Sequence, residues 1–138
     1  MIGIVILTHG QLGQSLIEAT EFILGHRPEG VTAVSIDLKE NADKLRAKIM
    51  EGIKKVDKKK GILILTDMFG GTPSNLSYSF LEESRVEVLS GINLPVLIKA
   101  ESARRTMEVG ELAQCVEDYG KKSISLASRI LKGNKKSK

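Results

Sequence analysis

The sequence predicts an α/β fold, in which an open and mainly parallel sheet carries helices on both faces. Short aliphatic runs alternate with longer segments whose apolar residues recur every three or four positions. The runs 2–7 and 62–65 contain almost no polar residue, as in strands that are covered on both sides. With 138 residues, the chain has room for one domain with its own core.

The first half of the chain contains two of these strand–helix units. Strand 2–7 precedes a helix that begins at about Leu12 and stops at Gly25, a residue suited to a helix end. Strand 31–36 precedes a helix capped by Asn41. The apolar residues that we expect on the buried face of this second helix are Leu45, Ile49, Ile53 and Val56.

The second half adds two more strands, 62–65 and 86–89, and further helices. A helix is expected from Pro73 to about Glu82, burying Leu76, Phe80 and Leu81. Segment 92–100 fits either a strand or a helix, although Pro95 near its start argues against a central strand. A long helix is expected from about Thr106 to Gly120.

The end of the chain is polar. Residues 123–126 alternate polar and apolar side chains, which is typical of a one-sided edge strand. The domain is expected to span residues 1–130, and the lysine-rich tail 131–138 is expected to be disordered.

Two polar residues follow the two aliphatic strands at equivalent places: His9 after the first and Asp67 after the third. By analogy with flavodoxin-like sheets, right-handed crossovers give the strand order 2-1-3-4, which places these strands side by side at the topological switch point. Open α/β sheets bind ligands there. An imidazole and a carboxylate are therefore expected to meet at this edge of the sheet.

A glycine turn follows Asp67 and leads into the third helix. Gly70 and Gly71 allow a tight turn, Thr72 is a good N-cap and Pro73 suits the first helical position. A helix N-terminus presents free N–H groups and a partial positive charge to an anion. The candidate phosphate-binding residues are Thr8, Gly10, Gly70, Gly71 and Thr72.

This constellation suits a histidine that carries phosphate. If Asp67 accepts the Nδ1 proton of His9, it selects the tautomer whose Nε2 is free to attack phosphorus. It also stabilises positive charge on the ring as the new bond forms. The phosphoryl oxygens need donors, which the glycine turn offers.

Three segments carry a resemblance to a known family: Ile4–Gly10, Thr66–Asn75 and Ser90–Pro95. They resemble the mannose-family IIA domain of the phosphoenolpyruvate-dependent sugar phosphotransferase system, over residues 1 to about 130. The resemblance implies a helix in segment 92–100, a phosphorylated His9 and an orienting Asp67. It also implies that the histidine phosphocarrier protein (HPr) donates the phosphoryl group, that a IIB component accepts it, and that the chain forms a homodimer.

Two functions remain open at this stage. The chain is a transport component that passes phosphate to a separate IIB polypeptide, or a regulatory module whose phosphorylation state controls binding to another protein. If the chain serves transport, it is expected to meet a membrane only through its transporter partners. A relative that serves dihydroxyacetone kinase shares the fold, but the Gly-Gly-Thr-Pro turn is closer to the mannose branch.

The homodimer is expected to form by exchange of residues 122–127, which would add an antiparallel strand to the free edge of the partner's sheet. The alternative is that residues 121–131 simply continue the preceding helix, with Ile124, Ala127 and Ile130–Leu131 on one stripe.

Other kinds of site are disfavoured. The glycine turn lacks the P-loop pattern and does not follow the first strand, as a dinucleotide fingerprint would. Two histidines and one cysteine, in unrelated elements, give no metal site, and no cofactor is expected. A receiver domain would need acidic residues after the first strand, where Thr8-His9-Gly10 stands.

The charge of the chain does not indicate nucleic acid. The net charge is +4, and residues 131–138 hold four lysines, so the remainder sums to +4 − 4 = 0. Few aromatic residues are present to stack on bases. The N-terminus has no signal-peptide pattern and the lone Cys115 cannot form an internal disulfide, so the cytoplasm is the expected location.

Overall fold

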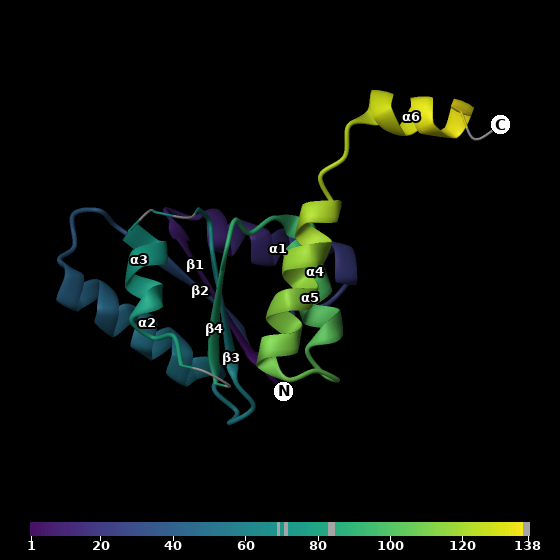
Figure 1. The fold of residues 1–138 in the computed structure, drawn as a ribbon. Coiled ribbons are helices and arrows are strands. Elements are labelled where there is room, and N and C mark those ends of the chain that lie inside the picture. Colours follow the sequence, from purple (N-terminus) through teal and green to yellow (C-terminus); the bar gives the residue numbers. More distant parts are fainter. Residues whose placement is uncertain (69, 71, 83–84, 137–138) are drawn as a thin grey trace.

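Four parallel strands form the centre of the protein in a computed structural model, which describes residues 1–68, 70, 72–82 and 85–136. The strands are β1 (Gly3–His9), β2 (Val31–Ile36), β3 (Ile62–Thr66) and β4 (Val86–Ser90). Their order is β2-β1-β3-β4 (Figure 1), which confirms the predicted order. The chain builds the sheet outward in one direction from β1 to β2 and in the other from β3 to β4, so the topological switch point lies between β1 and β3.

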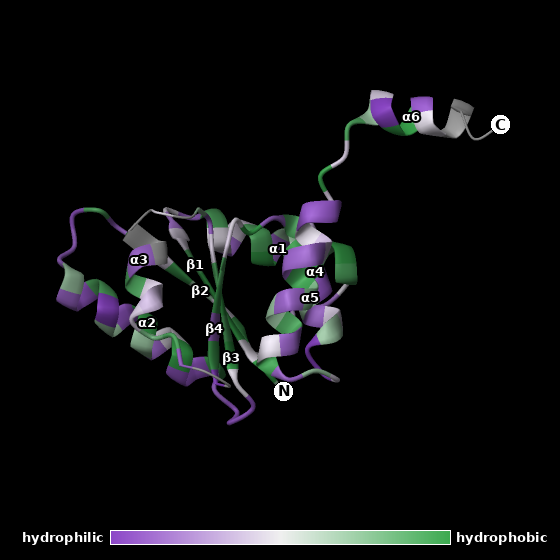
Figure 2. Ribbon diagram, in the orientation of Figure 1, coloured by the Kyte–Doolittle hydropathy of each residue, from purple (hydrophilic) through white to green (hydrophobic). Residues whose placement is uncertain are grey.

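Helices cover both faces of the sheet. Figure 1 shows α1 (Leu12–Leu24), α4 (Leu94–Ala103) and α5 (Val109–Lys122) on one side. On the other side lie α2 (Ala42–Val56) and α3 (Thr72–Tyr78). In Figure 2 the strands are largely hydrophobic, and the hydrophilic residues of the helices lie mainly on the sides that face away from the sheet. This is the two-sided burial that the aliphatic runs predict.

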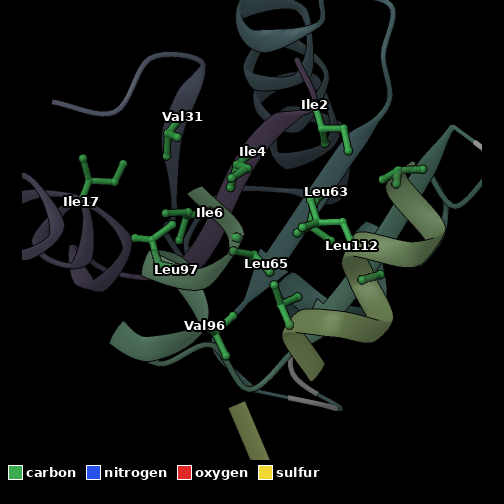
Figure 3. Packing of buried hydrophobic residues seen from close by; sticks show 14 residues of the cluster. Ile2, Ile4, Ile6, Ile17, Val31, Leu63, Leu65, Val96, Leu97 and Leu112 are labelled. Carbon is green, nitrogen blue, oxygen red and sulfur yellow. The ribbon is translucent and has the colours of Figure 1, made fainter. Parts of the chain in front are cut away.

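The core is divided by the sheet into two clusters, because successive strand residues point to opposite faces. Ile4 and Ile6 of β1 face the α1–α4–α5 side, where Figure 3 shows them packed with Leu63 and Leu65. Val5 and Leu7 face the other cluster, which contains the apolar stripe of α2. The stripe residues Leu45, Ile49, Ile53 and Val56 are all buried, as predicted.

The helix ends are set by local hydrogen bonds. Gly25 ends α1 in the left-handed conformation, with φ of 83°. The Asn41 side chain accepts a hydrogen bond from Lys44 N and begins α2. Segment 92–100 proves to be helical: the Asn93 side chain accepts from Val96 N, and Pro95 lies in the first turn of α4.

Two expected helices have different bounds. Helix α3 starts at Thr72, which is therefore its first residue rather than its cap, and ends at Tyr78 instead of Glu82. Tighter bonds, such as Leu81 N to Tyr78 O, follow it, and Leu81 is exposed rather than buried. Helix α5 starts at Val109 and continues past Gly120. A Cβ on Gly120 would lie 2.5 Å from Val96 Cγ2, so this glycine permits close packing of α4 and α5 instead of ending the helix.

The C-terminal arm, residues 123–136, leaves the body of the protein (Figure 1). Residues 124–126 form no strand here, and α6 (Ala127–Lys136) includes residues 131–136, for which the sequence indicates disorder. The predicted edge strand is thus not part of a single chain's sheet, and among the described strands β4 keeps a free edge. Within the described ranges, none of the helices combines the length and apolarity needed to cross a bilayer.

Candidate active site

His9 and Asp67 lie in direct contact at the carboxyl edge of the sheet. Leu7 of β1 pairs with Thr66 of β3, so the last residue of β1 and the first residue after β3 emerge beside each other. Asp67 Oδ2 accepts a hydrogen bond from the His9 backbone N–H at 3.0 Å, and the same oxygen lies 2.9 Å from His9 Nδ1. One carboxylate oxygen therefore fixes both the backbone and the ring of the histidine.

The electrostatics of this pair favour an ionised aspartate. Burial raises the pKa of Asp67, but the backbone and ring hydrogen bonds from His9 outweigh it, and the pKa lies below its ordinary value. A carboxylate at this position accepts a proton held on Nδ1. Nε2 then carries the free lone pair.

The two side chains differ in access to solvent. The His9 side chain is 36% exposed and that of Asp67 is 12% exposed. The ring is therefore reachable by a reacting group from outside, whereas its carboxylate partner is sheltered. This combination suits a nucleophile that is oriented from below by a buried group.

Thr8 has a structural place beneath the histidine. Its side chain is buried, and its hydroxyl oxygen accepts a hydrogen bond from Gly13 N at 2.8 Å. Gln11, the residue before α1, makes no capping bond with its side chain, so Thr8 supplies the cap from the end of β1. Between them Gly10 turns the chain with φ of +55°, in the left-handed region.

The glycine turn lies on the Asp67 side of the site. Gly70 is exposed and has φ of +82°, which explains why a glycine is needed there. Gly71 lies outside the described residues, and so does the side chain of Thr72. Next to the turn, Thr66 Oγ1 donates to Ser90 Oγ at 2.8 Å, which joins the ends of β3 and β4.

A cavity of about 600 Å³ opens beside His9. It is lined by residues 9–11 after β1, residues 35–39 at the end of β2, and Lys48 of α2. Lys48 belongs to no sequence motif and reaches the cavity only through the packing of α2 on the sheet, so no local pattern indicates it. His26 lies in an exposed loop after α1 and takes no part in the site.

The fold and this pair define a class: open α/β proteins with an accessible histidine, paired with a carboxylate, at the switch point of the sheet. The family model described as "PTS system fructose IIA component" matches residues 3–117. The chain belongs to this family and is a IIA component of the mannose family in sugar phosphotransfer.

Individual relatives agree with this assignment. The chain is 30% identical over 132 residues to the fructose-specific EIIA component of Bacillus subtilis, covering 95% of this chain and 90% of that protein. It is 36% identical over 104 residues to the mannose-specific EIIAB component of Escherichia coli, covering 75% of this chain but only 32% of that longer protein.

Solved structures also match. A phosphotransferase system EIIA component from Streptococcus agalactiae superposes with a TM-score of 0.83 at 29% identity, covering 94% of this chain and 99% of that one. A mannose/sorbose-specific IIA subunit from Enterococcus faecalis has a TM-score of 0.80 at 22% identity, covering 91% and 93% of the two chains, and shows the shared fold.

Proposed function

We propose that this protein carries a phosphoryl group on Nε2 of His9, taking it from phosphorylated HPr and passing it to a IIB component during sugar uptake. The observation that carries the proposal is the double contact of Asp67 Oδ2 with the backbone N–H and the ring Nδ1 of His9. A carboxylate in this place fixes the orientation of the ring and favours the tautomer with its proton on Nδ1, while the His9 side chain stays 36% exposed to a donor.

The transfer is a displacement at phosphorus. The Nε2 lone pair of His9 forms the new P–N bond while the P–N bond to the donor histidine breaks, and that electron pair returns to the donor ring. The Nδ1 proton stays on His9, hydrogen-bonded to Asp67, whose negative charge stabilises the positive charge gained by the ring. Transfer to the IIB acceptor reverses these steps.

The phosphoryl oxygens need donors around Nε2. We assign this role to backbone N–H groups of the turn Gly70–Thr72, together with the Thr72 hydroxyl. The N–H of Gly10 already donates to Ile36 O, so Gly10 contributes through the shape of its turn. The left-handed conformations of Gly10 and Gly70 support the assignment, because such turns bring backbone groups close to a ligand. Thr8, whose hydroxyl oxygen caps α1, contributes by holding the His9 turn in place.

The phosphorylated residue is tested directly. We would incubate the protein with phosphoenolpyruvate, the first enzyme of the system and HPr, and map the acid-labile phosphate. We expect full labelling of the wild type and of His26→Ala, and no labelling of His9→Ala. Label retained in His9→Ala would overturn the proposal. Label that forms but never moves to a IIB component would point instead to a regulatory module.

We propose that both transfers take place in the cytoplasm. We infer that the chain meets the membrane only through its transporter partners.

We also propose a homodimer in which the C-terminal arm of each chain covers the other. The arm exposes large apolar side chains, namely Ile124, Leu126, Ile130 and Leu131. A cavity of about 160 Å³ beside the end of β4 is lined in part by Leu89, Val96 and Val116. An apolar strand from a partner would fill such a site and complete the free edge of the sheet.

A further inference from the structure

One wall of the cavity beside His9 is a loop that is held by several hydrogen bonds. Residues 37–41 connect β2 to α2, and residues 37–39 of this loop line the cavity. Asp37 accepts hydrogen bonds from Lys39 N and, through its backbone oxygen, from Glu40 N. Asn41 caps α2 at the far end of the loop. These bonds shape the loop itself, but they do not fix it against the rest of the protein.

Lys48 supplies that connection. Its ammonium group donates to Ser35 O at 3.1 Å and to Glu40 Oε1 at 2.6 Å. The backbone oxygen of Ile36 points toward β1, where it accepts a hydrogen bond from Gly10 N. Because successive carbonyl groups of a strand alternate in direction, the oxygen of Ser35 faces the free side of β2. Lys48 thus joins the end of the edge strand, the loop and helix α2 through one group.

This ion pair differs from an ordinary surface pair. Exposed pairs generally contribute little, because solvent screens them and both side chains lose freedom. Here the Glu40 side chain is only 10% exposed, its hydrogen bond to Lys48 is short, and that bond holds the pKa of Glu40 below its ordinary value. Lys44 also approaches Glu40, but at 3.7 Å and with a side chain that is 68% exposed.

The position of the loop matters because it faces the reacting histidine. Leu38, at its tip, is 71% exposed and lines the cavity together with Lys39. Because His9 and the loop line the same cavity, a protein that delivers or removes a phosphoryl group at His9 comes close to the loop. A loop displaced by about 1 Å would change the fit of that protein, and small misplacements of reacting groups are costly.

We infer that Lys48 is a positioning residue of the phosphotransfer site, which holds loop 37–41 in the conformation on which the partner protein seats. The inference rests on the proposed function and deepens it. Lys48 acts through the loop and leaves the chemistry at Nε2 to His9 and Asp67. It should therefore govern transfer between proteins and not the intrinsic reactivity of the histidine.

The test compares Lys48→Met with Lys44→Met, two variants that each remove one ammonium group near Glu40 from the same helix. Transfer from phosphorylated HPr is measured over a range of HPr concentrations. For Lys48→Met we expect kcat/KM to fall on the order of tenfold, mainly through KM. Lys44→Met should stay within about twofold of the wild type, and Lys48→Arg should recover most of the loss.

A second donor separates docking from chemistry. Phosphoramidate, a small phosphoryl donor that needs no protein surface, should phosphorylate His9 equally fast in the wild type and in Lys48→Met. Glu40→Gln should reproduce part of the HPr defect, because Lys48 keeps its bond to Ser35 O. The double variant should be no worse than Lys48→Met, which already breaks both bonds. Thermal melts of each variant check that the fold persists.

The outcomes are distinct. A Lys48→Met protein that matches the wild type with HPr overturns the inference while leaving the proposed function intact. Equal loss with HPr and with phosphoramidate also overturns it, because Lys48 would then act on the chemistry or the fold. A wild-type protein that accepts no phosphate on His9 overturns the proposed function and this inference together.

Discussion

Replacing Asp67 isolates the contribution of the carboxylate to phosphoryl transfer. In Asp67→Ala the ring loses its Nδ1 partner and the His9 backbone N–H loses its acceptor, since both bond to the same oxygen. Only the ring contact strengthens as positive charge develops. A hydrogen bond to a charged group contributes about 1.5–3 kcal/mol, and each 1.4 kcal/mol is tenfold in rate. With tautomer control lost as well, we expect transfer to slow on the order of 10²-fold.

The assay is rapid-quench transfer from phosphorylated HPr at saturating concentration. Asp67→Asn keeps the size of the side chain and removes its charge, so it separates charge from geometry. The matched control is Asp37→Asn, which removes a carboxylate that lines the same cavity but has no contact with the His9 ring, and which keeps an oxygen for Lys39 N. We expect the control to transfer at the rate of the wild type. A wild-type rate in Asp67→Ala would refute the reasoning and make Asp67 a turn residue.

Three further predictions follow from the same structure. The folded-state pKa of Asp67 is depressed, so ionised Asp67 stabilises the fold above the ordinary pKa of an aspartate, and this stabilisation is lost as the pH falls through the folded-state pKa. Thermal unfolding measured at decreasing pH should show this loss in the wild type and not in Asp67→Asn. Gly120→Ala should lower the unfolding free energy by about 1–3 kcal/mol through its clash with Val96, whereas Gly110→Ala, which meets no atom within 4 Å, should be neutral or stabilising in denaturant titrations. Truncation after Gly120 should abolish the dimer or cause aggregation; light scattering that finds a stable monomer for both the full chain and the truncation would contradict the dimer.

Much of the fold follows from patterns that are local in the sequence. Aliphatic runs identify the strands, and the stripe of α2 together with Asn41 identifies the helix and its start, because each depends on residues within a few turns. The strand order came from general rules of handedness and from analogy, and it placed His9 beside Asp67 correctly.

The features that sequence patterns did not predict depend on contacts between distant elements. Gly120 reads as a helix stop, and only the proximity of Val96 reveals that it serves packing. Arg104 is buried and donates to the backbone oxygens of Ile2, Glu29 and Gly30, which no local pattern announces. Likewise the bond from Lys48 to Ser35 joins a helix to a strand edge thirteen residues away.

The central claim is that Nε2 of His9 carries the phosphoryl group while Nδ1 keeps its proton on Asp67. It is tested most directly by nitrogen-15 and phosphorus-31 NMR of protein labelled at histidine and phosphorylated through HPr. The account predicts phosphorus coupling to Nε2 of His9 alone, with a proton on Nδ1. Coupling to Nδ1, or to either nitrogen of His26, would contradict it.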